Sequence, residues 1–284
     1  MIEGAYQGFA VEIRDRGVAL VTFDRPERLN AMSFGTRRDL VEILGLAQLD
    51  DDVRVVVMTG TGRGFVAGVN NDRSVVEPPT LVPDRPAAQH VPVNLYAQLV
   101  HHAQEPVRAI RRLDKLTIAA VNGYAIQLGL SIVLACDFAV AARSAQLGSA
   151  TLRMGWQPDE GGHWLLVEHL GVKRALEFLM RKRIVSATEA QSLGLVNEVV
   201  DDGDLLDAAL GLATELAGGP QVAMRMLKKA VYNAARLTFD QAGDDIASKT
   251  AISDYHTDAV EGSAAFRDKQ PATFNKWLTE PPAD

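Results

Sequence analysis

The chain has 284 residues, of which 47 % are hydrophobic and 23 % charged, enough apolar material for one large core and too much for a disordered chain. Its formal net charge of -7 and pI near 5.4 argue against nucleic acid or a membrane surface as the main partner. The single cysteine, Cys136, excludes an internal disulfide and indicates a reducing compartment. We find no signal-peptide pattern and no apolar run near the length of a membrane span, and therefore expect a cytoplasmic protein.

The first third of the chain alternates between strand and helix patterns. Residues 9–13 and 18–23 alternate apolar and polar side chains, which predicts two strands. Ser33 is placed to cap a helix that follows it. A β-branched run at 53–59 predicts a buried strand, and a glycine-rich loop follows at 60–68.

The middle of the chain contains the most apolar segments. Five prolines between 75 and 92 predict a long loop of the kind that covers a site. A helix is expected at 93–112, and buried strands at 116–121 and 138–142. Residues 128–136 are apolar on all sides, which predicts a fully buried helix whose first N–H groups need a partner. Such a helix start is suited to hold an oxygen that gains negative charge.

Helical patterns dominate after residue 161. Gly194 ends a helix that Ser186 starts, and a break at 218–220 precedes three amphipathic helices. We therefore divide the chain into a strand-and-helix core, residues 1–200, and a helical C-terminal region, residues 201–284. The helices expected in this half are at 162–169, 172–180, 204–217, 221–236, 238–252 and 254–268.

Several common catalytic motifs are absent from the sequence. The glycines at 60–64 are spaced GxGxG instead of GxGxxG, and the lysine of a phosphate-binding loop is missing. There is no GxSxG turn and no HExxH, and the six histidines lack the spacing of zinc ligands. We therefore predict neither a dinucleotide cofactor nor a metal site.

Two strand-turn-helix segments, 66–70 and 125–129, share one pattern. If their strands are neighbours, their turns lie at one edge of a sheet, and two N–H groups could converge on one oxygen. The carboxylate pair Asp159 and Glu160 follows, which suggests chemistry beside a carbonyl group. Two alternatives stay open, that Asp159 only caps the helix starting near Gly161 and that Glu160 is solvated or a first-turn helix acid.

The two tryptophans that flank this pair have different expected roles. Core packing is the preferred interpretation for Trp164. Trp156 is equally compatible with the core and with the wall of a pocket.

The sequence resembles the enoyl-CoA hydratase/isomerase (crotonase) superfamily over almost its full length. The segments that carry the resemblance keep the order and spacing of the family: 18–26, 29–31, 64–68, 121–125, 136–137, 186–200 and 261–269. The resemblance implies an α/β fold, a spiral of ββα units with two near-perpendicular sheets. It also implies a C-terminal helical region that builds homotrimers, often paired into hexamers.

The resemblance further implies an acyl-CoA thioester as substrate, with coenzyme A as part of the substrate and no other cofactor or metal. The N–H groups of Val69 and Leu128 match the two donors that hold the thioester oxygen of an enolate. The remaining residues would contact coenzyme A, the last two from the C-terminal region: Arg25, Arg28, Leu29, Val66, Ala67, Phe266 and Lys269.

Departures from the family pattern bear on the reaction. Where hydratases of the family carry two glutamates that activate water, this chain has Ser131 and Thr151, and neither hydroxyl is a useful acid or base near neutral pH. The segment 158–166 resembles the enoyl-CoA isomerases of phenylacetate degradation, in which the aspartate matching Asp159 shuttles a proton. We therefore favour isomerisation with Asp159 as base, and regard Glu160, Ser131, Thr151 and Trp156 as further catalytic or pocket candidates.

Three alternatives remain open at this stage. The chain could be an orthodox enoyl-CoA hydratase, or a hydrolase or dehalogenase on the same scaffold. Halobenzoyl-CoA dehalogenases have a nucleophilic aspartate at the position of Asp159, but a tryptophan at that of Thr151. A non-catalytic acyl-CoA-binding or RNA-binding relative is the third alternative. The acyl group is not specified by the sequence.

Overall fold

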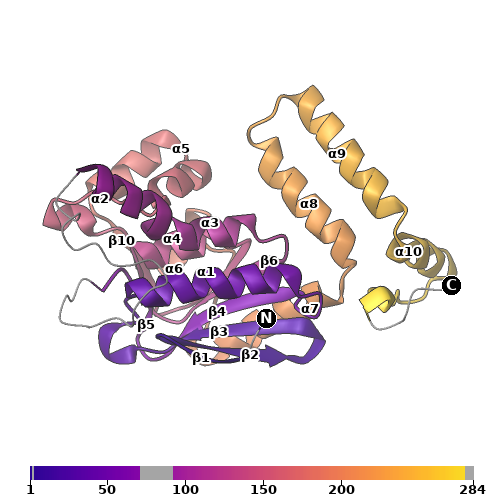
Figure 1. Ribbon diagram of the computed structural model, residues 1–284, viewed down its shortest axis with the longest axis horizontal. Coiled ribbons are helices and arrows are strands. Elements are labelled where there is room, and N and C mark those ends of the chain that lie inside the picture. Colours follow the sequence, from indigo (N-terminus) through magenta and orange to yellow (C-terminus); the bar gives the residue numbers. More distant parts are fainter. Residues whose placement is uncertain (2, 71–91, 279–284) are drawn as a thin grey trace.

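A computed structural model describes residues 1, 3–70 and 92–278 of the chain (Figure 1). Two sheets and the helices around them form a core, and three C-terminal helices extend away from it. The loop predicted at 75–92 lies outside the described residues except for its last residue, Pro92, which begins a helix.

The larger sheet has seven strands, most of them apolar and buried on both faces, as parallel strands covered by helices are. Pairings are antiparallel from β1 to β3 and parallel from β3 onward. All five strands expected between 9 and 142 are present in it. In spatial order the strands are β1 (Gly4–Tyr6), β2 (Phe9–Arg14), β3 (Val18–Phe23), β4 (Val55–Gly60), β6 (Leu116–Val121), β8 (Phe138–Ala142) and β11 (Glu198–Val200).

The smaller sheet has four strands, and its strand β5 corrects the loop that we expected throughout 60–68. A side chain at Gly64 would approach the carbonyl oxygen of Leu29 to 2.6 Å, so the glycine lets this backbone pack closely as a strand. In spatial order the strands are β10 (Ile184–Ser186), β9 (Gln146–Gly148), β7 (Tyr124–Ile126) and β5 (Gly64–Ala67).

The first helices lie over the larger sheet. Helix α1 (Phe34–Leu49) begins where predicted, because the Ser33 side chain accepts a hydrogen bond from the Thr36 N–H. The single helix expected at 93–112 is instead α2 (Pro92–Gln98), a π-helical turn (Leu99–Ala103) and α3 (Glu105–Arg112). Pro106, in the first turn of α3, cannot donate a backbone hydrogen bond and so favours a new helix start.

Helix α4 (Leu128–Ala135) is buried at every residue, as its apolar sequence predicted. Helix α5 (Gly162–Met180) is interrupted at Gly171, which has φ 72°, and this confirms the two expected helical pieces. Helix α6 (Ala187–Ser192) follows. Helix α7 (Leu205–Gly218) lies beyond the predicted domain boundary at residue 200 yet contacts β4, β6 and β8, so the helices that stand apart begin after it.

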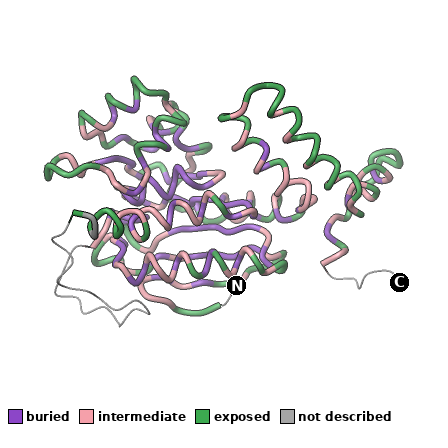
Figure 2. Tube along the Cα trace, turned by 45° about the horizontal axis from the view of Figure 1, so that its top comes forward, coloured by how far each residue is buried: buried purple, intermediate pink, exposed green. Residues whose placement is uncertain are grey.

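Helices α8 (Gln221–Ala234), α9 (Phe239–Asp254) and α10 (Thr257–Asp268) form an arm that we call the C-terminal arm. Figure 2 shows that most of the arm is exposed, in contrast to the buried strands of the core. Phe239 and Phe266 are 92 % and 87 % exposed. None of the helices in the described residues is long and apolar enough to cross a membrane.

Candidate active site

Two turns meet at one edge of the smaller sheet. Strands β5 and β7 pair in parallel, with Ala67 opposite Ile126, so the residues that follow both strands emerge side by side. A side chain at Gly129 would overlap the carbonyl oxygen of Val66, which shows how closely the second turn packs against β5. The neighbouring strands assumed from the sequence are therefore present.

The first turn leaves the Val69 N–H without an acceptor among the described residues. Met32 donates to the carbonyl of Gly68 at 3.0 Å and accepts from the Asn70 N–H at 2.9 Å. In this parallel bridge the N–H of the intervening Val69 points away from Met32. Gly68 adopts φ 87°, a conformation that suits glycine and allows the chain to turn here.

The second turn presents the start of helix α4. Leu128 is its first residue, and no acceptor for the Leu128 N–H occurs in residues 1, 3–70 or 92–278. The preceding Gln127 has φ 55° and ψ -101°, backbone angles that are costly for a residue with a side chain. Such strain persists only where the surroundings hold it in place.

The Gln127 side chain is held by three partners. Its Oε1 accepts hydrogen bonds from the hydroxyls of Ser149 at 2.7 Å and Thr151 at 3.2 Å. Its Nε2 donates to a carboxylate oxygen of Glu160 at 2.9 Å. Gln127, Ser149 and Glu160 are all buried. This network, which we call the Gln127 cluster, links the turn before Leu128 to the carboxylate pair.

The burial of Glu160 corrects the interpretation that it is solvated. Only 2 % of the residue is exposed, and it precedes α5 instead of lying in the first turn of that helix. Burial raises the pKa of the Glu160 carboxyl, and the nearby Asp159 charge raises it further, while the hydrogen bond from Gln127 acts in the opposite direction. The sequence alone did not reveal this, because the glutamate is buried by segments remote in the chain.

Asp159 is half-buried and lies beside Glu160 in the turn before α5. The alternative that Asp159 only caps this helix is wrong, because the N-cap is Gly161 and no side chain bonds to the helix start. The aspartate is thus not engaged in the structural role that competed with catalysis.

Ser131 and Thr151, which occupy the positions of the hydratase glutamates, both serve the Gln127 cluster. Ser131 donates its hydroxyl hydrogen to the backbone carbonyl of Gln127 at 3.1 Å, and a side chain at Gly162 would overlap that hydroxyl. The Thr151 hydroxyl is bound to the Gln127 amide, as described above. Each hydroxyl therefore has a local hydrogen-bonding role.

A cavity of about 380 Å³ lies between α3, the start of α5 and the turn after α8, and Glu160 forms part of its wall. Trp164 also lines it and is 43 % exposed, which corrects the expectation that this tryptophan packs in the core. The guanidinium groups of Arg111 and Arg236 lie 5.5 and 4.8 Å from its ring centre, so cation–π contacts hold the tryptophan at the cavity. Trp156 is 53 % exposed and does not line this cavity.

The residues expected to contact coenzyme A fall into two groups. Arg25, Arg28 and Leu29 lie next to β5, because the Ala67 N–H donates to the Leu29 carbonyl at 3.0 Å. The Asn30 side chain holds this segment in place. It accepts a hydrogen bond from the Arg25 N–H and donates to the backbone carbonyls of Thr61 and Gly64, just before β5 and at its first residue.

The second group lies elsewhere in the chain. Phe266 and Lys269 are exposed on α10 and at its end, at the far side of the molecule from β5 (Figure 1). One chain therefore does not bring Phe266 and Lys269 to Arg25 and Arg28, because the C-terminal arm points away from the core.

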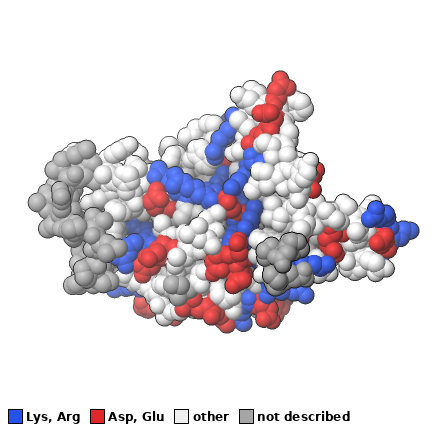
Figure 3. All heavy atoms as spheres, turned by 45° about the vertical axis from the view of Figure 1, so that its right-hand side comes forward, with Lys and Arg blue, Asp and Glu red and all other residues white. Residues whose placement is uncertain are grey.

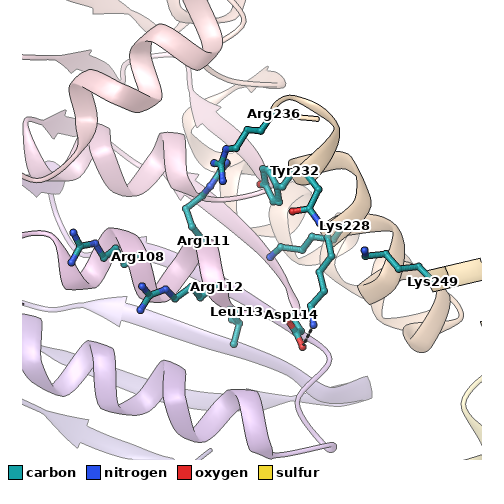
Figure 4. A pocket seen from close by; sticks show the side chains of 11 residues that line it. Arg108, Arg111, Arg112, Leu113, Asp114, Lys228, Tyr232, Arg236 and Lys249 are labelled. Atoms are coloured by element: carbon teal, nitrogen blue, oxygen red, sulfur yellow. Dashed lines mark ion pairs between the residues drawn. The ribbon is translucent and has the colours of Figure 1, made fainter. Parts of the chain in front are cut away.

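A second cavity, of about 420 Å³, lies between α3 and α8 and is rich in cations. Figure 3 shows Lys and Arg side chains gathered on this face, and Figure 4 shows Arg111 pointing from α3 toward Tyr232 on α8 and Arg236 in the turn after it. The Arg111 guanidinium lies 3.7 Å from the Tyr232 ring centre. Most cations here already have acidic partners, as Lys228 has in Asp137 and Lys229 in Asp114.

Comparison with known proteins assigns the chain to a family. The family model described as enoyl-CoA hydratase/isomerase matches residues 14–277. This chain belongs to the enoyl-CoA hydratase/isomerase family. Its fold is accordingly the crotonase-like α/β fold that the sequence motifs implied, with two sheets and a C-terminal helical region.

Relatives in this family have different names. The chain is 35 % identical over 262 residues to the 1,2-epoxyphenylacetyl-CoA isomerase of Escherichia coli, covering 92 % of this chain and 95 % of that protein. It is 37 % identical over 218 residues to a probable enoyl-CoA hydratase of Mycobacterium tuberculosis, with coverage of 76 % and 74 %. A crystal structure of an enoyl-CoA hydratase from Polaromonas sp. JS666 superposes with a TM-score of 0.83 at 30 % identity, covering 94 % and 99 % of the two chains. These similarities support an acyl-CoA enzyme. The relatives' names include both an isomerase and hydratases.

Proposed function

We propose that this enzyme moves the double bond of an unsaturated acyl-CoA thioester through a thioester enolate. The observation that carries the proposal is the pair of neighbouring turns, which present the N–H groups of Val69 and Leu128 at one sheet edge without acceptors in the described residues. Each such donor, aimed at an oxygen that gains charge, contributes about 10²–10³-fold to kcat.

Asp159 is the proposed base. With a 3-enoyl-CoA, its carboxylate removes a proton from C2, and the C–H electron pair spreads into a dienolate whose oxygen is held by the two N–H groups. A proton added at C4 then yields the 2-enoyl-CoA, so no atom is gained or lost. One carboxyl group suffices when it returns the proton that it removed.

Isomerisation is preferred to hydration because Ser131 and Thr151 are both bound to Gln127. Neither hydroxyl replaces the glutamates that position water in hydratases. The Glu160 carboxyl group is bonded to Gln127, the residue before Leu128, and Asp159 is its neighbour in the sequence. Hydration, hydrolysis and dehalogenation remain the alternative reactions within the family. The alternative without catalysis is an acyl-CoA-binding protein.

An assay with 3-enoyl-CoA and 2-enoyl-CoA substrates tests the proposal. We expect the wild type to isomerise 3-enoyl-CoA, and the Asp159→Asn variant to lose about 10²–10⁴-fold in kcat. The exposed Asp244 of α9 provides the control Asp244→Asn, which should retain full activity. Isomerisation that survives Asp159→Asn contradicts the base assignment, and rapid hydration of crotonyl-CoA favours the hydratase. Failure to bind any acyl-CoA favours the non-catalytic alternative.

The position of α10 supports an oligomer in this proposal. Because Phe266 is 87 % exposed and its helix α10 lies far from β5, we propose that α10 of a second copy completes the coenzyme A site of a homotrimer or hexamer. Sedimentation would reveal the assembly. Phe266→Ala should raise the KM for acyl-CoA more than it lowers kcat, and an active monomer with an unchanged KM would contradict this arrangement.

A further inference from the structure

Glu160 has one fixed side-chain contact and forms part of the wall of a cavity. One carboxylate oxygen accepts a hydrogen bond from Gln127 Nε2 at 2.9 Å, and the residue also lines the 380 Å³ cavity. A buried carboxyl group that a neighbouring side chain holds in one position can act on a bound molecule without first reorienting.

The Gln127 cluster allows one orientation of the Gln127 amide. The amide nitrogen faces Glu160 and the amide oxygen faces Ser149 and Thr151, so the Glu160 oxygen that accepts from Nε2 is the one without a proton, and the other oxygen can carry one. Both hydroxyls then donate to Oε1. With all three partners in place, neither Gln127 nor the attached Glu160 is free to rotate.

Asp159 and Glu160 are adjacent carboxyl groups in unlike surroundings. Asp159 is half-buried, whereas Glu160 is 2 % exposed. Burial disfavours the charged form of a carboxyl group, so the more buried of two neighbouring carboxyl groups holds its proton more strongly. This is the arrangement of an acid beside a base.

The charged side chains that face Glu160 do not change which of the two carboxyl groups holds its proton more strongly. Arg108 and Arg111 on α3 line the same cavity, but each already has an acidic partner, Glu105 and Glu168 respectively. Arg236 approaches from the turn after α8 and lies over the Trp164 ring. Burial nevertheless dominates and raises the pKa of Glu160.

We propose that Gln127 is a positioning residue that holds Glu160 at the cavity as the proton donor, the partner of Asp159 in double-bond migration. The inference rests on the proposed function and refines it. Asp159 takes the proton from C2, and the Glu160 O–H gives its proton to C4 while the dienolate electrons form the new C2=C3 bond. Asp159 then carries a proton and Glu160 a negative charge, and proton transfer between these neighbours restores both groups.

A substrate deuterated at C2 distinguishes one carboxyl group from two. If Asp159 alone moved the proton, deuterium would reappear at C4 in a single turnover in H₂O. With Glu160 as donor, the first product carries hydrogen at C4. In Glu160→Gln we expect kcat to fall about 10²-fold or more, with residual turnover transferring deuterium to C4.

Gln127→Met keeps the side-chain volume and removes the amide. We expect kcat to fall about tenfold and deuterium transfer to C4 to increase, because Glu160 is no longer held. The high-pH limb of the kcat profile should move upward, since the lost hydrogen bond favours the charged form and its removal raises the pKa of Glu160 further. A purely structural role for Gln127 would not move this limb.

Two further variants guard against a folding defect. Gln127→Gly relieves the strain of φ 55° and should fold at least as well as the wild type, while still losing activity. Gln191→Met removes a matched amide on α6, whose Nε2 bonds to the Asn197 carbonyl, and should retain wild-type kinetics. Wild-type kcat, labelling and pH profile in both Gln127 variants would overturn the inference.

A titration without turnover separates this inference from the proposed function. In protein labelled with ¹³C at the glutamate carboxyl groups, we expect one signal whose titration gives a pKa above the usual range for glutamate. This signal should be absent in Glu160→Gln, and its pKa should be higher still in Gln127→Met. If the wild type isomerises no enoyl-CoA, the proposed function fails, whatever the titration shows. If the wild type is active but this signal is unmoved in Gln127→Met, the inference fails alone.

Discussion

Lys228 Nζ lies 2.7 Å from a carboxylate oxygen of Asp137, and only 5 % and 7 % of the two side chains are exposed. Asp137 follows the core helix α4, whereas Lys228 belongs to the C-terminal arm. The same carboxylate accepts from the Thr117 hydroxyl at 2.9 Å and the Tyr232 hydroxyl at 2.7 Å. This buried ion pair therefore fastens the arm to the core at its first helix.

Breaking this pair should destabilise the protein strongly. Lys228→Met leaves the Asp137 charge buried without its cation, so we expect the free energy of unfolding to fall by about 3–5 kcal/mol. Urea denaturation followed by circular dichroism measures the change. Lys229→Met is the control, because the neighbouring lysine pairs with Asp114 at the surface and should contribute at most about 1 kcal/mol. Equal effects of the two substitutions would contradict the buried anchor.

Gly129 should tolerate no side chain. In Gly129→Ala the new methyl group overlaps the Val66 carbonyl oxygen, a backbone atom of β5 that cannot rotate away. We expect a loss of more than about 3 kcal/mol in the free energy of unfolding, seen as a lower Tm. Gly45→Ala, in helix α1, meets open space and should raise stability by about 0.5–1 kcal/mol. A stable Gly129→Ala protein would show that the two turns are less closely packed.

Lys115 should make stability depend on alkaline pH. The lysine is buried with its Nζ donating to the Asp50 carbonyl, and burial lowers its pKa to about 8 from 10.5. Between these values the unfolded chain binds more protons than the folded one, so stability rises with pH, by at most about 1.4 kcal/mol per pH unit.

Lys115→Met removes this contribution and measures it. The unfolding free energy of the wild type should increase relative to Lys115→Met as the pH rises from about 8 to 10.5. Denaturation curves at three pH values across this interval suffice. If the difference in unfolding free energy between the wild type and Lys115→Met stayed constant with pH, or decreased as the pH rose, the lowered pKa of Lys115 would be contradicted.

Cys136 should be chemically inert in the folded protein. The thiol is fully enclosed, and burial raises its pKa, so little thiolate is present to react. We expect no reaction with a disulfide reagent in buffer and one equivalent in guanidinium chloride. Rapid labelling of the native protein would show that α4 opens locally, contrary to its complete burial.

Local patterns predicted the regular elements well. The apolar run at 128–136 could only be a buried helix, and the amphipathic repeats after residue 220 correspond to α8, α9 and α10. These elements follow from periodicity, which a sequence shows directly. The strand β5 was missed because its glycines suggest a loop, and its pairing with β7 involves residues about sixty positions away.

The candidate site was only partly visible in the sequence. The motifs around Val69, Leu128 and Asp159 indicated the family, which the comparisons confirmed, and their catalytic roles remain predictions. Nothing in the sequence distinguishes the neighbouring carboxylates Asp159 and Glu160. The sequence led us to expect that Glu160 is the solvated one, whereas it is buried. Nothing in the sequence marks Gln127 as the centre of a buried cluster, because its partners come from two later segments, around Ser149 and Thr151 and at Glu160.

The sequence by itself determined the family, the apolar core and the absence of hydratase glutamates at Ser131 and Thr151, since these depend on residue type and local order. Tertiary structure alone decided that Glu160 is buried beside Gln127 and that α10, which carries Phe266, lies far from β5. Burial, and with it the pKa of a carboxyl group, depends on which distant segments exclude water from it. That information arises only when the chain is packed.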